Sequence, residues 1–110
     1  MLLRERQRGI ENIYPDSEQL NQTRWAKMLG ISISGLQAAM RRGGVETRIV
    51  HGRYHPSILT RVEDFPSIIR GLISSRRRRD RYLWPEVDTT KDFQIKARSG
   101  AILIYEYPHS

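Results

Sequence analysis

Arginine is the residue type in this chain whose number and spacing point most directly to a chemical role. Sixteen of the 19 basic residues are arginines, the acidic residues number 12, and the formal net charge is +7. Guanidinium groups form planar, paired hydrogen bonds to phosphate and to the edge of guanine, whereas lysine acts mainly as a point charge. The sequence therefore predicts a polyanionic partner. Charge alone does not distinguish DNA from RNA or from an anionic membrane, so the sequence motifs must identify which of them binds.

The remaining reactive residue types form no catalytic or metal-binding pattern. His51, His55 and His109 lack a partner at metal-ligand spacing, and we expect the first two to bond phosphate or backbone beside a hairpin. The sequence shows no Gly-rich phosphate loop, paired carboxylates or nucleophile elbow. Cysteine is absent, which excludes disulfides and thiolate zinc sites. We therefore predict a protein that is not an enzyme, with no metal, no cofactor and no evident small-molecule substrate.

Length and hydropathy set the expected size and location. The 110 residues fit one compact unit, alone or with a small appendage, and 38% of them are hydrophobic. No apolar run approaches the roughly 18 residues that span a bilayer. Residues 1–10 carry four charges in place of a signal-peptide core. We expect a cytoplasmic, nucleoid-associated protein without membrane contact.

Two segments of helical periodicity lie between Gln22 and Arg42. The apolar positions of the first are Trp25, Ala26, Met28 and Leu29, and those of the second are Ile33, Leu36, Ala39 and Met40. Gly30 ends the first helix and Gly43-Gly44 ends the second, because glycine takes the left-handed conformation without steric cost. We expect Trp25 in the core. Gly35 costs about 1 kcal/mol inside a helix; it either permits close approach to a DNA backbone or simply weakens the helix.

Shorter elements are expected on both sides of this helix pair. Residues 1–14 form a short helix or a frayed arm, and the turn signal at 14–17 predicts a further short helix through Leu20. Residues 48–50 and 53–55 form a hairpin with its turn at His51-Gly52, closed by Pro56. A helix runs from Pro66 to about residue 80 and ends in an arginine run. Residues 92–107 form a second hairpin that turns at Ser99-Gly100.

Residues 22–32 resemble the helix-turn-helix of Cro-type phage repressors. Residues 39–45 and 48–54 resemble the helix, glycine and wing order of excisionases and MerR-like winged helices. Together these segments cover about a third of the chain. The resemblance implies that the second helix enters the major groove of DNA and that its outward residues meet the bases.

The candidate DNA-binding residues fall into three groups. Base-facing candidates on the second helix are Ser32, Ser34, Gln37, Ala38, Arg41 and Arg42. Candidates for phosphate contact are Arg24, Lys27, Arg48 and Arg53. The third group is the arginine run Arg76, Arg77, Arg78 and Arg79, extended by Arg81. Such a run can simply complement a helix dipole, but five arginines in six residues favour nucleic-acid binding.

These observations predict an α+β fold: a small helix-turn-helix domain, winged or Cro-like, with a hairpin wing and a C-terminal hairpin. We expect residues 1–80 to bind DNA and residues 81–110 to form an extension. Because residues 102–107 are apolar on both faces, this extension either dimerises or forms an intramolecular sheet.

The predicted function is sequence-specific binding of double-stranded DNA by a homodimer, as a transcriptional repressor or an excisionase-like factor of a phage or mobile element. Two alternatives are a protein-interaction module, such as a phage-encoded inhibitor of a host nucleoprotein complex, and an RNA-binding protein that uses the arginine run.

Overall fold

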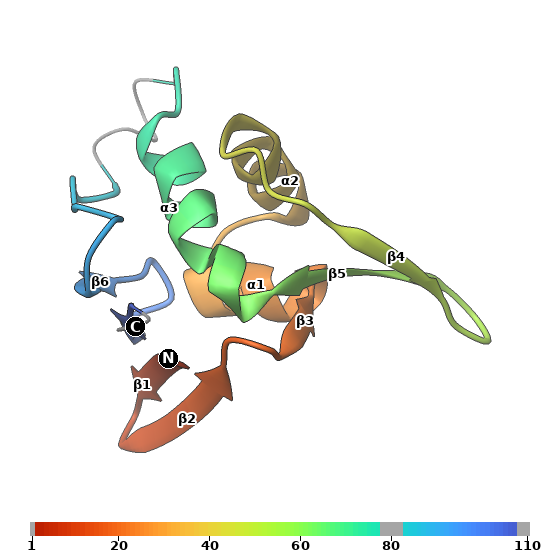
Figure 1. The fold of residues 1–110 in the computed structure, drawn as a ribbon, viewed down its shortest axis with the longest axis horizontal. Helices are drawn as coiled ribbons and strands as arrows, with labels where there is room; N and C mark the ends of the chain where they lie inside the picture. The colour runs from red at the N-terminus through yellow and green to blue at the C-terminus, as the bar shows by residue number, and fades with distance from the viewer. Residues whose placement is uncertain (1, 78–82, 108–110) are drawn as a thin grey trace.

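The computed structural model describes residues 2–77 and 83–107, which form three α-helices and two antiparallel sheets (Figure 1). The strands are β1 (Leu2–Gln7), β2 (Ile10–Pro15), β3 (Gln19–Asn21), β4 (Arg48–His51), β5 (Pro56–Arg61), β6 (Phe93–Lys96) and β7 (Ile102–Glu106). The helices are α1 (Gln22–Leu29), α2 (Ile33–Arg42) and α3 (Phe65–Ile73), with a short 3-10 helix at Val62–Asp64. The larger sheet has the order β2-β1-β7-β6 and the smaller β3-β5-β4. The α+β class is therefore confirmed.

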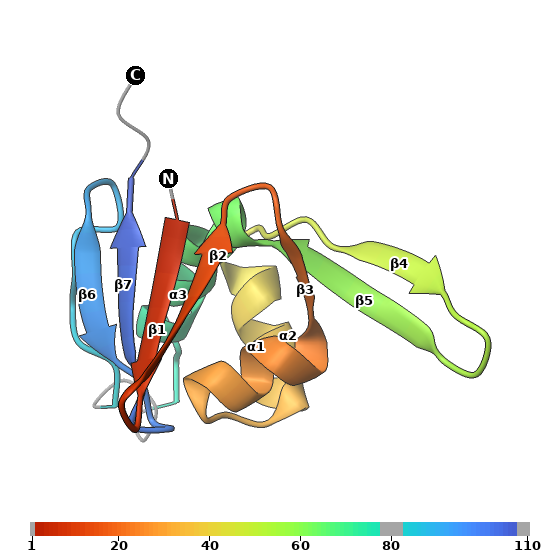
Figure 2. The same ribbon diagram turned by 90° about the horizontal axis from the view of Figure 1, so that it is seen from below.

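The core lies between the larger sheet and the helices. Figure 2 shows this sheet on one side of the helices and the β4–β5 hairpin projecting from the other. Leu103 and Tyr105 of the central strand β7 are buried. The ring of Trp25 stacks on Phe65 at 5.7 Å between centroids, and Phe65 stacks on Phe93 at 5.6 Å. These rings join α1, α3 and β6, and the prediction that Trp25 belongs to the core is confirmed.

Local capping sets the bounds of α1 and α2. The Asn21 side chain accepts a hydrogen bond from the first turn of α1, and the Ser32 hydroxyl accepts one from the Gly35 amide at the start of α2. Gly30 ends α1 in the left-handed region at φ 72°. A Cβ atom there would also lie 2.3 Å from the Ser99 backbone nitrogen. Glycine is thus required twice over, and the predicted pair of helices joined at Gly30 is confirmed.

Helices α2 and α3 approach each other through glycine. A Cβ atom on Gly71 of α3 would lie 1.9 Å from the Ala39 carbonyl oxygen of α2. At the end of α2, a Cβ atom on Gly43 would lie 2.0 Å from the Ser67 carbonyl oxygen. Real Cβ atoms do not approach oxygen so closely, so this contact between the two helix backbones depends on both glycines.

The N-terminal segment differs from the expected helix or arm. Strands β1 and β2 form a hairpin whose turn contains Arg8 and Gly9, both at positive φ. Strand β3 likewise replaces the short helix expected before Leu20, because Leu20 pairs with Thr60 in the smaller sheet. The alternation of β1 is hard to read from the sequence because Glu5, an acidic residue, occupies a buried inward position.

Two further boundaries differ from their predictions. The loop of the β4–β5 hairpin covers residues 52–55 and is not confined to His51-Gly52, so Pro56 opens β5 rather than closing it. Proline is tolerated as the first residue of a strand because the ladder does not need its missing N–H there. Helix α3 ends at Ile73, earlier than residue 80; Ser74 caps it by donating its backbone N–H to the Arg70 carbonyl.

The C-terminal hairpin forms as predicted, and β7 pairs with β1 as well as β6. Residues 93–106 thus belong to an intramolecular sheet that shares its core with the N-terminal half. The division at residue 80 stays a prediction, since that position lies outside the described residues. Dimerisation through residues 102–107 also stays a prediction. The Arg4 guanidinium pairs with Glu106 at 3.2 Å on the outer face of this sheet.

Candidate nucleic-acid interface

Helix α2 buries three of its four predicted apolar positions and leaves a largely polar face outside; the fourth, Ile33 in its first turn, is 43% exposed. Leu36, Ala39 and Met40 are buried against the rest of the fold. The opposite face carries exposed Ser34 and Arg41, separated by about two turns. Because the buried stripe fixes the rotation of the helix, this outward face is the surface that α2 can offer to a partner.

The other α2 candidates lie on this face or at its edges. Ala38 is half-buried between Ser34 and Arg41. Gln37 is half-buried, and its side-chain amide donates to the Gln22 side-chain oxygen at 3.2 Å. Arg42 is exposed and donates from Nε to the Gly71 carbonyl at 2.8 Å. Ser32 is exposed but its hydroxyl caps the helix. The structure therefore groups all six α2 candidates, and the side chains of Ser32, Gln37 and Arg42 already form hydrogen bonds within the protein.

The β4–β5 hairpin extends away from the body beside the end of α2 (Figures 1 and 2). Both of its predicted phosphate contacts, Arg48 and Arg53, are exposed. The Arg53 guanidinium lies 5.6 Å from the centre of the Tyr54 ring, whose residue is 80% exposed. Ile49 is 58% exposed on the same hairpin. The hairpin thus offers arginines and large apolar side chains to a partner rather than to the core.

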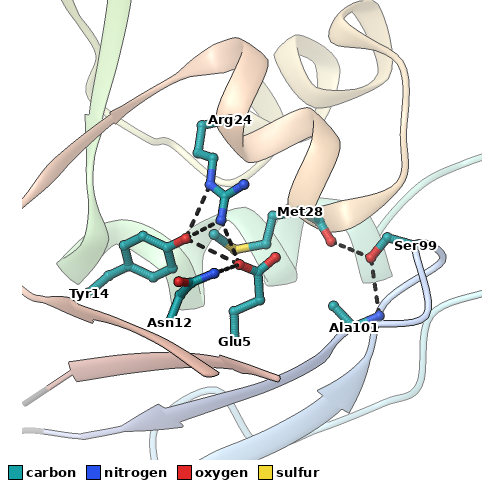
Figure 3. Close-up of polar contacts among 7 residues, drawn as sticks. All are labelled: Glu5, Asn12, Tyr14, Arg24, Met28, Ser99 and Ala101. Carbon is teal, nitrogen blue, oxygen red and sulfur yellow. Dashed lines mark hydrogen bonds and ion pairs between the residues drawn. The ribbon is translucent and has the colours of Figure 1, made fainter. Parts of the chain in front are cut away.

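Arg24 does not belong to this surface, and its predicted phosphate contact is corrected. Figure 3 shows its guanidinium directed at Glu5 and Tyr14 of the β1–β2 hairpin. Arg24 lies 2.6 Å from the Glu5 carboxylate and also donates to the Tyr14 hydroxyl. Asn12 donates to the same carboxylate oxygen at 3.2 Å. Burial raises the pKa of Tyr14, while its hydrogen bond with Arg24 lowers it. The charge of Arg24 is thus neutralised inside the protein.

The remaining predicted residues lie elsewhere. Lys27 is exposed in the last turn of α1. Arg76 and Arg77 are exposed beyond the end of α3, so they do not cap its last turn. Arg78, Arg79 and Arg81, like His109, lie outside the described residues. Of the two described members of the run, Arg77 lines a cavity with Arg41 and Arg42 of α2.

Arg98 is a basic residue of this region that the sequence analysis missed. It lies in the turn between β6 and β7 and lines the same cavity. The next residue, Ser99, donates its hydroxyl to the Met28 carbonyl at 2.6 Å and accepts from the Ala101 amide (Figure 3). These bonds fix the turn against the end of α1. Nothing in the sequence distinguishes Arg98 from an ordinary solvated arginine in a hairpin turn. Arg98 comes near α2 only because the β6–β7 turn packs against the end of α1, which is distant in the sequence.

Charge is distributed unevenly along the chain. Residues 22–59 contain six basic side chains and one acidic side chain, Glu46. The described ion pairs of the chain involve Arg4, Arg6, Arg24, Arg61 and Lys91. Within the described ranges, no carboxylate pairs with Arg41 or Arg42 of α2 or with Arg48 or Arg53 of the projecting hairpin, whereas Arg61 at the end of β5 pairs with Glu46, Glu63 and Asp64. This side of the molecule therefore presents positive charge that the fold itself does not neutralise.

Comparisons of the chain with protein-family models, curated proteins and solved structures gave no match. Among residues 2–77 and 83–107, no helix is long and apolar enough to cross a membrane. In the same described ranges, no group of three or more histidine or acidic residues is arranged to hold a metal ion. A functional assignment therefore depends on the residues and geometry of this chain.

Proposed function

We propose that the protein binds double-stranded DNA, with the outward face of α2 in the major groove and the β4–β5 hairpin against the neighbouring backbone. One observation carries this proposal: α2 exposes Ser34 and Arg41, with half-buried Ala38 between them, beside a projecting hairpin that carries exposed Arg48 and Arg53. No described carboxylate pairs with these arginines. An uncompensated basic surface of this kind favours a polyanion.

The dimensions of α2 suit a major groove. An α-helix with its side chains is roughly 10–12 Å wide, and the groove of B-DNA is about 12 Å wide. The ten residues of α2 extend roughly 15 Å along the helix axis. Arg41 can contact guanine or phosphate, and Ala38 can contact a thymine methyl group. Gln37 can pair with adenine only after its amide leaves Gln22.

The biological role that we propose follows the resemblance described above. A protein of this kind acts as a transcriptional repressor or as an excisionase-like architectural factor of a phage or mobile element. Two copies would bind a palindromic site, because two-fold symmetry in the protein matches two-fold symmetry in the DNA. We also propose association with the nucleoid, as a consequence of DNA binding. Arg24 is not part of the proposed interface.

Charge-removal variants test the interface. Arg41→Ala should weaken binding to a selected duplex by about tenfold and reduce the slope of log affinity against log salt by about 1. The matched control is Arg6→Ala, which removes the same charge from the outer face of the larger sheet, where Arg6 pairs with Glu11 at 3.6 Å. Arg6→Ala should change the affinity by less than about twofold. Fluorescence polarisation at several salt concentrations measures both quantities.

Other results would contradict the proposal. Equal losses of duplex affinity in Arg41→Ala and Arg6→Ala would mean that binding depends only on the net charge of the protein and not on the face of α2. Preference for a structured RNA over every duplex would favour the alternative in which the arginine run binds RNA. Absence of binding to either polymer at low salt would favour the protein-interaction alternative.

A further inference from the structure

A cavity of about 390 Å³ lies beside α2, on the side toward the end of α3. Four arginines line it from three separate segments of the chain. Arg41 and Arg42 come from α2, Arg77 from the segment after α3, and Arg98 from the β6–β7 turn. Guanidinium groups repel one another, so an anion that enters this recess would relieve the repulsion among them.

The part of the chain that the structure describes places no negative charge in the cavity wall. Among residues 2–77 and 83–107, its lining includes no aspartate or glutamate, and no carboxylate of these ranges forms an ion pair with the four arginines. Arg42 donates through Nε to the Gly71 carbonyl, which fixes the direction of its guanidinium. No described residue bonds the two terminal nitrogens of Arg42. These nitrogens have the fork geometry that binds two oxygens of a phosphate group.

The other walls suit an organic group attached to the phosphate. Leu72, Trp84 and Ile31 supply apolar surface, and Ser34 supplies a hydroxyl. A volume of about 390 Å³ falls within the range of roughly 300–1,000 Å³ for small-molecule sites.

We propose that this cavity binds a small phosphorylated molecule of nucleotide size. Its phosphate groups contact Arg42, Arg77 and Arg98, and its organic part lies against the apolar wall. Ligand binding here requires no DNA. Because Arg41 and Ser34 belong both to the cavity and to the outward face of α2, the ligand and a duplex should compete wherever both bind.

Pyrophosphate and adenosine diphosphate are suitable probes, with sulfate at equal ionic strength as the control anion. Calorimetry should show binding of at least one of the two probes at micromolar to submillimolar concentration, and sulfate should bind more weakly. The chain has two tryptophans, and Trp84 lines the cavity whereas Trp25 is fully buried. Trp84→Phe should therefore abolish any fluorescence response to the probe.

Arg98→Ala separates this inference from the proposed DNA binding, because Arg98 is not part of the proposed DNA interface. The variant should lose about tenfold or more in probe affinity while its duplex affinity changes by less than about twofold. Lys96→Ala, which removes a charge from a nearby exposed position, should alter neither. Circular dichroism confirms that both variants fold.

Three results would overturn the inference. The first is that neither probe binds at about 1 mM. The second is that Arg98→Ala and Lys96→Ala bind the probe equally well. The third is that Arg98→Ala weakens duplex binding as strongly as probe binding, because the cavity would then be part of the surface that contacts DNA phosphates.

Discussion

Replacement of Gly71 by alanine should destabilise the fold by about 3 kcal/mol or more. The new methyl group would lie 1.9 Å from the Ala39 carbonyl oxygen, within the backbone of a neighbouring helix. Backbone cannot move aside as a flexible side chain does, so α2 and α3 would have to separate. For a chain of this size each 1 kcal/mol lowers the melting temperature by roughly 4–8 °C. Thermal unfolding followed by circular dichroism should therefore show a loss of more than about 12 °C, or no folded state.

Gly35→Ala is the matched control, because it makes the same substitution within a helix. A Cβ atom at Gly35 would meet only the Ser32 hydroxyl oxygen at 3.2 Å, and Ser32 is exposed. Alanine also favours the helical state by up to about 1 kcal/mol over glycine. Gly35→Ala should therefore melt at or slightly above the temperature of the unmodified chain. A Gly71→Ala variant that melts within a few degrees of it would contradict the close contact between α2 and α3.

Replacement of Glu5 by alanine should destabilise the fold by about 2 kcal/mol. Glu5 is 3% exposed, and its carboxylate accepts hydrogen bonds from Asn12, Tyr14 and Arg24 (Figure 3). Without it, the Arg24 guanidinium keeps its charge but loses its partner. The value is set below that of a fully buried pair because the Arg24 side chain is 33% exposed and water can partly replace the carboxylate.

A double-mutant cycle separates this pair from other effects of Glu5. Arg24→Ala alone leaves Glu5 buried without its cation and should also destabilise the fold. The double variant should be less destabilised than the sum of the two single variants, by at least about 1 kcal/mol, because the interaction can be lost only once. Urea unfolding of the four proteins measures these free energies. Additive changes would show that Glu5 and Arg24 do not interact in solution.

The helix pair could be predicted from the sequence because its signals are local. Asn21 caps the start of α1 and Ser32 caps the start of α2. Gly30 ends α1 directly after its last apolar residue. The C-terminal hairpin was predictable for the same reason, since Ser99-Gly100 lies between two alternating segments. In each case the decisive residues are neighbours in the sequence, so periodicity and turn chemistry were sufficient.

The N-terminal half of the larger sheet could not be predicted in this way. Strand β1 buries Glu5 and leaves its partner strand with Ile10 and Ile13 exposed by 64% and 54%. Both facts invert the usual rule that apolar residues face the core. The strand forms because β7, about a hundred residues later, pairs with it, and because Arg24 compensates the buried carboxylate.

The candidate site was predictable in part. The α2 residues follow from helical spacing, and the structure places them together on one face or at its edges. The role of Arg24 was wrong because its acidic partner lies 19 positions earlier, on a strand that the sequence did not reveal. The cavity could not be predicted because its four arginines come from three separate segments of the chain. No local sequence pattern indicates that Arg98 lies near Arg41.

The most direct test of the central claim is an amide chemical-shift map of the isotope-labelled protein with a selected DNA duplex. The proposed interface predicts shifts at Ser34, Ala38 and Arg41 on α2 and at residues 48–53 of the hairpin, with none on the outer face of the larger sheet around Arg6. Shifts centred on that outer face, or an unchanged spectrum with saturating duplex at low salt, would contradict the claim that α2 binds DNA.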